Sequence, residues 1–182
     1  MTGENALKAN EVCAPKGSKA TAPKANKMSA QVSAANEKID MKIAIGGDHA
    51  GFPYKDPLKK MLEKMGHEVT DYGTNSPESV DYPDYIHPLA SAMEEKKHEL
   101  AVIICGSGNG VAITANKHQH VRAAVCWKVE LAELGRKHNN ANAISIPARF
   151  VSLKMAKNMV KAFISTDFEG GRHARRVGKI PC

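Results

Sequence analysis

The chain has 182 residues, with 42% hydrophobic and 25% charged residues and a formal net charge of +7. This composition is ordinary for a globular protein of one domain. The chain contains no apolar run near the ~20 residues that a membrane span needs and no apolar signal segment at its start. We therefore expect a cytoplasmic protein with no membrane partner. Aromatic residues make up only 5% and the basic residues are dispersed apart from one late cluster, which argues against nucleic acid as a partner.

Residues 1–40 differ in composition from the rest. They are rich in Ala, Lys, Ser and Asn and contain no aromatic residue. Such a segment cannot bury enough apolar surface to offset the entropy of ordering, so we expect a disordered N-terminal extension. A transit peptide is the alternative, but the segment has no Arg and carries Glu4, Glu11, Glu37 and Asp40. The folded domain is expected to cover residues 41–182.

Apolar runs of strand length alternate with segments of helical periodicity in this domain. The predicted strands are 42–46, 68–72, 100–105, 121–126 and 143–146. The predicted helices are 54–65, 85–97, the segment from the glycine-rich turn to 117, 130–137 and 151–164. This alternation predicts a single-domain, three-layer α/β/α fold with a five-stranded parallel, Rossmann-like sheet.

Ligands in such sheets bind beyond the carboxyl ends of the strands. That rule directs attention to the loops 46–53, 72–84, 105–110 and 147–150. The third loop carries Gly106, Gly108 and Gly110 between an apolar strand and a helix. Glycines there let backbone N–H groups converge on an anion, whereas a tight turn with positive φ is the alternative. Neither a dinucleotide fingerprint nor a nucleotide P-loop has this spacing and position, so no cofactor is expected.

Cys105 stands where the most apolar strand meets the glycine-rich loop. A thiol beside a helix start tends toward the thiolate, which can act as a nucleophile or a proton acceptor. A small buried apolar residue is the alternative. Cys126 ends another apolar strand and is expected to be structural. The four cysteines are widely scattered, so a disulfide framework is not expected.

Two histidines stand beside polar partners. His49 follows Asp48 at the end of the first strand, and His138 precedes Asn139; such pairs suit proton transfer near a cleft. His118 and neighbouring His120 lack a third ligand at a suitable spacing, so they are expected to be surface residues, and no metal is expected.

Arginines cluster near the end of the chain. Gly170 and Gly171 precede Arg172 and Arg176. This pattern suits a phosphate clamp because a guanidinium group forms bidentate hydrogen bonds with phosphate oxygens. A solvated basic tail is the alternative. Arg149, just past the fifth predicted strand, is a further candidate.

Several motifs occur together in a fixed order. They are Gly47-Asp48-His49-Ala50-Gly51, Asp81-Tyr82-Pro83, Cys105-Gly106-Ser107-Gly108-Asn109-Gly110, Arg136-x-His138-Asn139-x-x-Asn142 and Gly170-Gly171-Arg172-His173-x-x-Arg176. In these motifs the chain resembles the ribose-5-phosphate isomerase type B family, which shares a superfamily with galactose-6-phosphate isomerase. The resemblance covers residues 41 to about 181, and the extension has no counterpart in it.

The resemblance implies interconversion of ribose 5-phosphate and ribulose 5-phosphate through an enediolate, with no metal or cofactor. It further implies a homodimer or tetramer whose sites are shared between subunits. Ser107 replaces a threonine that is frequent in the family, and the hydroxyl is retained. The resemblance assigns the following roles: Cys105 as base; His138 in ring opening; Ser107, Gly106, Gly108, Asn109 and Gly110 around the enediolate oxygens; Asp48 and Tyr82 at the sugar; His49, Arg149, Arg172 and Arg176 around the phosphate; and Asn139 as a further substrate contact.

Two other functions remain open. A hexose-6-phosphate isomerase, acting on allose or galactose 6-phosphate, would use the same chemistry on a longer sugar. A non-catalytic sugar-phosphate-binding protein would keep the glycine loop and the arginines but would need no reactive thiol. The combination of Cys105, Asp48 and His138 favours an enzyme.

Overall fold

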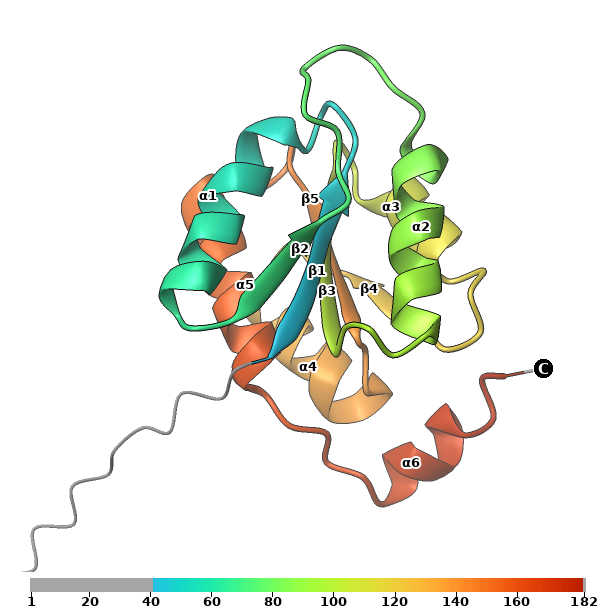
Figure 1. Cartoon of the computed structure of the whole chain (residues 1–182). Helices are drawn as coiled ribbons and strands as arrows, with labels where there is room; N and C mark the ends of the chain where they lie inside the picture. Colours follow the sequence, from blue (N-terminus) through green and yellow to red (C-terminus); the bar gives the residue numbers. More distant parts are fainter. Residues whose placement is uncertain (1–40, 182) are drawn as a thin grey trace, which may run out of the picture. The chain divides into compact units, whose positions relative to one another are not determined.

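A computed structural model describes residues 41–181, so the extension expected for residues 1–40 lies outside the described part. Strands and helices alternate along it, and a short helix follows the last strand–helix pair (Figure 1). The strands are β1 (Lys42–Gly47), β2 (Glu68–Asp71), β3 (Leu100–Cys105), β4 (Ala123–Val125) and β5 (Ala143–Pro147). The helices are α1 (Phe52–Lys64), α2 (Tyr82–Glu94), α3 (Asn109–Ala115), α4 (Val129–Asn139), α5 (Leu153–Ser165) and α6 (Arg172–Val177).

All strands pair in parallel in one five-stranded sheet of order β2-β1-β3-β5-β4. The predicted fold class is thus confirmed. β3 lies in the middle of the sheet, and every residue from Leu100 to Cys105 is buried. A central strand covered on both faces needs apolar side chains in both directions, which explains its continuous apolar run.

Two hydrophobic cores flank the sheet because successive side chains of a strand point to opposite faces. Val102 and Ile104 of β3 share one core with residues of α1, α4 and α5. Ile103 and Cys105 share the other with residues of α2 and α3. Figure 1 shows α1 and α5 on one side of the sheet and α2 and α3 on the other, which gives three layers.

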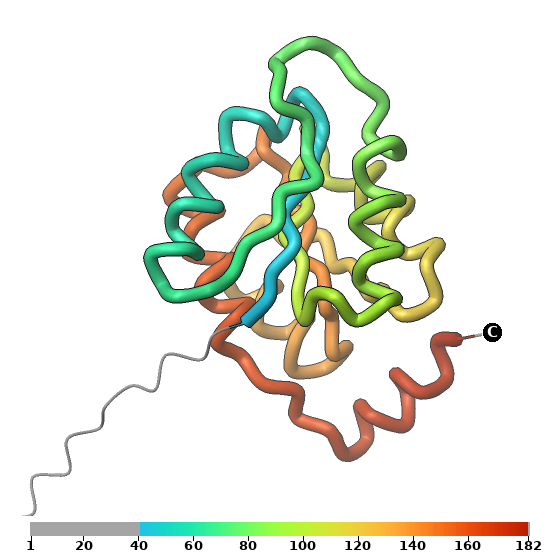
Figure 2. The backbone as a smooth tube through the Cα atoms, viewed as in Figure 1, coloured from blue at the N-terminus to red at the C-terminus, as the bar shows by residue number. Residues whose placement is uncertain are grey.

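The connections that follow the neighbouring strands β1 and β3 lead to opposite faces of the sheet. The chain passes from β1 to α1 on one face and from β3 to α3 on the other. Connections that diverge from adjacent parallel strands leave a crevice at the carboxyl edge of the sheet. Figure 2 shows the long connection between β2 and α2, residues 72–81, rising at this same edge.

Most element boundaries differ from the prediction by one to three residues, and α2 and β4 are two examples. Helix α2 begins at Tyr82 rather than at residue 85, with Pro83 in its first turn. Proline is favoured there because the first helical N–H groups have no partner within the helix, and the apolar periodicity begins only later. Strand β4 is confined to Ala123–Val125, shorter than predicted.

Helix α6 was not predicted. It spans six residues and buries only His173, so it offers no apolar period to detect. Gly170 and Gly171 lead into it with φ of 68° and 54°, a backbone region that glycine enters without steric cost. Among the described residues, no helix has the length and apolarity to cross a membrane.

Candidate active site

A pocket of about 400 Å³ opens at the carboxyl edge of the sheet, where the crevice was expected. All four loops singled out from the sequence contribute to it. Its lining consists of Asp48, His49, Ala50, Tyr82, Cys105, Gly106, Ser107, Gly110, Arg149 and Phe150. The structure therefore brings together the thiol, the glycine-rich loop and half of the predicted polar residues, namely Asp48, His49, Tyr82, Ser107 and Arg149.

The thiol of Cys105 lies at the end of β3, where the residue is 5% exposed. Its Sγ accepts a hydrogen bond from the backbone N–H of Gly108 at 3.1 Å. Gly108 has φ of +77°, which a side chain would disfavour. Ser145 fixes the same residue by donating from Oγ to the Gly108 carbonyl at 2.6 Å. The loop thus folds back on the sulfur, and this contact holds the thiol at the pocket.

Two residues at the end of β1 contribute polar groups. Asp48 Oδ1 accepts from the N–H groups of Ala50 and Gly51 at 2.9 and 3.1 Å, which fixes the carboxylate at the turn. His49 Nδ1 accepts from the N–H of Val80 at 3.2 Å. A ring nitrogen that accepts carries no proton, so the proton of the neutral ring is on Nε2.

Two glycines of this site allow larger side chains to pack on the loop. A Cβ atom at Gly110 would lie 2.7 Å from the ring of Tyr82, and one at Gly106 would lie 3.2 Å from Nε of Arg149. The ring and the guanidinium therefore lie directly on the loop. Arg149 is also fixed by its own N–H, which donates to the Gly106 carbonyl at 3.0 Å.

His138 and Asn139 lie at the opposite edge of the sheet. They are the last residues of α4, just before β5 begins at Ala143. Ala143 pairs with Ala101 near the start of β3, whereas Cys105 is the last residue of β3. Within one chain, the structure does not bring His138 and Asn139 to the pocket of Cys105.

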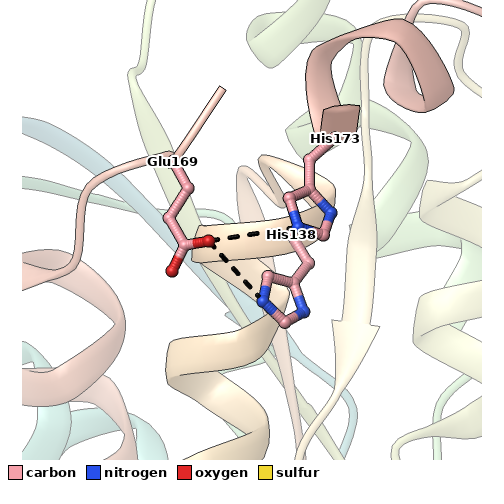
Figure 3. A group of neighbouring side chains, drawn as sticks. All are labelled: His138, Glu169 and His173. Atoms are coloured by element: carbon pink, nitrogen blue, oxygen red, sulfur yellow. Dashed lines mark ion pairs between the residues drawn. The ribbon is translucent and has the colours of Figure 1, made fainter. Parts of the chain in front are cut away.

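Helix α6 is joined to the end of α4 by a cluster of His138, Glu169 and His173 (Figure 3). The two imidazole rings stack with their centroids 4.2 Å apart and their planes 1° apart. Glu169 Oε2 lies 3.8 Å from Nε2 of His138 and 3.9 Å from Nε2 of His173. Arg172 and Arg176, which belong to α6, are thereby placed with His138 and away from the pocket.

The chemistry of this second group of residues suits an anion better than a cation. Two imidazoles and a carboxylate within 4.8 Å are ligand types of a divalent metal. However, Nε of Arg172 donates to Nε2 of His173 at 3.4 Å, and Arg176 lies one turn further along α6. Burial, the neighbouring imidazole of His138 and the guanidinium of Arg172 lower the pKa of His173. Two guanidinium groups beside imidazoles are typical of phosphate binding.

The sequence did not reveal Phe150 and Glu169, nor the contacts of His118, which lies outside this pocket. Phe150 is 75% exposed at the pocket; a large apolar residue in a polar loop was the available signal. No motif or residue spacing in the sequence indicates that Glu169 lies beside His138. His118 was expected at the surface, but its side chain is only 15% exposed. It lies 2.9 Å from His87 and 3.0 Å from Glu94, both on α2, a long-range contact that spacing cannot reveal.

Cys126 has the structural environment that was expected for it. It is fully buried, and burial raises the pKa of its thiol to about 12. His120 is exposed, as expected.

Comparisons with known proteins agree with the motifs. The chain is 42% identical over 139 residues to ribose-5-phosphate isomerase B of Escherichia coli, which covers 76% of this chain and 93% of the relative. It is 38% identical over 141 residues to D-erythrulose-4-phosphate isomerase of Pectobacterium atrosepticum, covering 77% and 93%. Among solved structures, ribose-5-phosphate isomerase B of Clostridium thermocellum matches with a TM-score of 0.76 at 44% identity, covering 77% of this chain and 95% of that chain.

The type B ribose 5-phosphate isomerase of Trypanosoma cruzi also matches, with a TM-score of 0.75 at 35% identity, covering 78% and 95%. A model of the Ribose/Galactose Isomerase family matches residues 43–180. The chain therefore belongs to the ribose/galactose isomerase family and is a sugar-phosphate isomerase.

Proposed function

We propose that the chain interconverts D-ribose 5-phosphate and D-ribulose 5-phosphate, a reaction of the pentose phosphate pathway, with Cys105 as the base. The observation that carries this proposal is the thiol of Cys105, which lines the pocket and accepts a hydrogen bond from its own glycine-rich loop. Relatives named as ribose-5-phosphate isomerases, at 42% and 44% identity, support the choice of substrate.

The chemistry follows from moving one proton between adjacent carbons. The Cys105 thiolate takes the proton from C2 of the open-chain aldose, which leaves a negative enediolate and a neutral thiol. A proton passes from O2 to O1, and the thiol then returns its proton to C1 to give the ketose and the thiolate again. Such a base contributes most when donors surround the developing oxyanion. Ser107, which lies two residues from Cys105 in the lining of the pocket, is suited to donate to an enediolate oxygen.

The remaining lining groups suit the rest of the substrate. The Asp48 carboxylate and the Tyr82 hydroxyl can bind sugar hydroxyls, and the Nε2–H of His49 and the Arg149 guanidinium can donate to phosphate oxygens. The net charge of +7 favours encounter with an anionic substrate.

A second copy of the chain would complete the site. His138, Asn139, Arg172 and Arg176 have the chemistry of ring opening and phosphate binding, yet they lie at the edge opposite Cys105. In a symmetric homodimer each pocket can receive these residues from the partner. A dimer or a tetramer built from such dimers would both satisfy this requirement.

Apolar surface beside the pocket supports this assembly. Trp127 and Phe150 are 52% and 75% exposed and line one hollow of about 340 Å³ together with Ser107. Large apolar side chains exposed together are typical of interaction sites. A second copy seated there would also exclude water from the thiol.

The test is to measure turnover of ribose 5-phosphate, allose 6-phosphate, galactose 6-phosphate and erythrulose 4-phosphate by the full chain in the presence of a chelator. We expect kcat/KM to be highest for ribose 5-phosphate. The tetrulose phosphate is included because a relative at 38% identity is named for it. A higher kcat/KM for any of the other sugars would be consistent with the proposed proton transfer but would refute ribose 5-phosphate as the preferred substrate. Binding of sugar phosphates without turnover would support a binding protein instead.

A further inference from the structure

Lys55 is a buried cation outside the pocket. It lies on α1 and is 2% exposed. Its ammonium donates to Oδ2 of Asp71 at 2.8 Å, to the Thr74 carbonyl at 2.7 Å, to Oδ1 of Asn75 at 3.0 Å and more weakly to the Gly73 carbonyl at 3.4 Å. Every one of these oxygens belongs to the last residue of β2 or to the start of the connection 72–81.

The far end of this connection is fixed by a residue of the pocket. The N–H of Val80 donates to Nδ1 of His49 at 3.2 Å. In between, only the first part of the connection follows the sheet: the N–H of Thr74 donates to the Gly47 carbonyl at 3.2 Å. The connection is therefore held at its start by Lys55 and at its end by His49, and Tyr82 of the pocket follows directly.

We infer that Lys55 is a positioning residue of the site: by anchoring the connection 72–81, it keeps the Val80 N–H on Nδ1 of His49, so that His49 donates to a phosphate oxygen through Nε2. This inference deepens the proposed function and rests on it for the identity of the substrate. The other tautomer would turn an acceptor toward the phosphate, where two electron-rich atoms would oppose each other.

The contacts explain why a lysine suits this place. Its buried charge is compensated by the carboxylate of Asp71, and the further oxygens satisfy the ammonium. Asp71 is also engaged through Oδ1, which accepts from the N–H of Gly73 at 2.8 Å. Methionine has a similar length but no N–H group, so Lys55→Met removes the anchoring bonds while keeping the buried volume.

The experiment uses the full chain labelled with 15N, without substrate, and reads the tautomer of His49 from the chemical shifts of its ring nitrogens. His49→Gln assigns the signals. Lys60→Met is the matched control, because Lys60 is on the same helix but exposed. Asn75→Ala is a milder variant that removes one of the oxygens around the ammonium, and it carries the test if Lys55→Met does not fold.

We expect wild type and Lys60→Met to show the Nε2–H form, and Lys55→Met to show a mixture of both tautomers. Because phosphate contacts serve ground and transition states alike, KM for ribose 5-phosphate should rise about tenfold in Lys55→Met while kcat falls less than about threefold. Asn75→Ala should shift both readouts in the same direction and by less.

The inference would be overturned if Lys55→Met folds and has the same His49 tautomer and the same KM as Lys60→Met. If Lys55→Met does not fold, the same result for Asn75→Ala would overturn it. The tautomer is read without turnover, so it stands apart from the choice of substrate. A chain that keeps the expected tautomer pattern but isomerises no sugar phosphate would refute the proposed function and leave the positioning role of Lys55 intact.

Discussion

Cys105 and Gly108 form a closed turn in which the backbone N–H of Gly108 donates to the sulfur at 3.1 Å. The turn combines a buried strand end with a positive-φ glycine, so the thiol is held in one place at the pocket. Preorganisation of this kind matters for proton transfer, because small displacements of a base from the reacting carbon cost large factors in rate.

Replacing Cys105 with alanine should remove turnover and leave binding nearly intact. General acid–base groups contribute roughly 10²–10⁴ in rate, so kcat should fall by about a thousandfold. Substrate affinity, measured by calorimetry, should change less than about threefold, because the side chain forms no part of the proposed phosphate or hydroxyl contacts. Cys126→Ala is the control: burial keeps that thiol neutral, with a pKa of about 12, and the variant should retain activity. Normal turnover in Cys105→Ala would refute its role as base.

His138→Asn should affect the two directions of the reaction unequally. The aldose reaches the enzyme as a ring that has to be opened, whereas the ketose is already open. We expect a loss of about 10²-fold with ribose 5-phosphate and a clearly smaller loss with ribulose 5-phosphate, from initial rates in both directions. The exposed His120→Asn should match wild type. Equal losses in both directions would contradict a role in ring opening.

Gly47→Ala should destabilise the fold. A Cβ atom there would lie 2.1 Å from the carbonyl oxygen of Ile104, so β1 and β3 would have to separate. Overpacking of this kind costs about 1–3 kcal/mol, which urea denaturation can measure. Gly178→Ala is the matched control, since its Cβ would lie 3.4 Å from the Ala174 carbonyl oxygen, an ordinary contact distance. Equal stability of the two variants would show that the strands adapt without cost.

His98 should make stability depend on pH. Its Nε2 is 2.9 Å from the Tyr72 hydroxyl, and its Nδ1 is buried without a hydrogen-bond partner. Burial lowers the pKa of His98, so the unfolded chain binds the proton more readily than the folded chain. The contribution of neutral His98 to the free energy of unfolding should therefore be complete above the ordinary pKa of about 6.5. It should decrease as the pH falls below that value.

The comparison for this prediction is His98→Gln, measured by urea denaturation at about pH 8 and about pH 5.5. The decrease in unfolding free energy on acidification should be larger in wild type than in the variant. An identical decrease in both proteins would show that His98 does not titrate differently in the two states.

The sequence predicted the sheet and the pocket edge well because both follow from local patterns. The apolar run of β3 and the glycines after it identified the central strand and the loop around Cys105. Boundaries were less accurate where proline or polar residues begin a helix, as at Tyr82. Helix α6 was missed because only His173 is buried in it.

Contacts between distant segments could not be predicted from spacing. In the sequence, Lys55 is one of several lysines on a predicted helix. Only the fold shows that its ammonium contacts Asp71 and the oxygens of the connection 72–81. In the same way, the pairing of His118 with His87 depends on how α2 packs. The placement of His138 away from Cys105 follows from the direction of α4, which no motif encodes.

The measurement that tests the central claim most directly is complementation between two inactive variants. Cys105→Ala lacks the proposed base, and His138→Asn lacks the residue proposed to come from the partner. Random reassociation of equal amounts gives about half mixed dimers, each with one intact site, so activity should recover to about one quarter of wild type. If both residues served a site within one chain, the mixture would be no more active than the separate variants, and the shared site would be refuted.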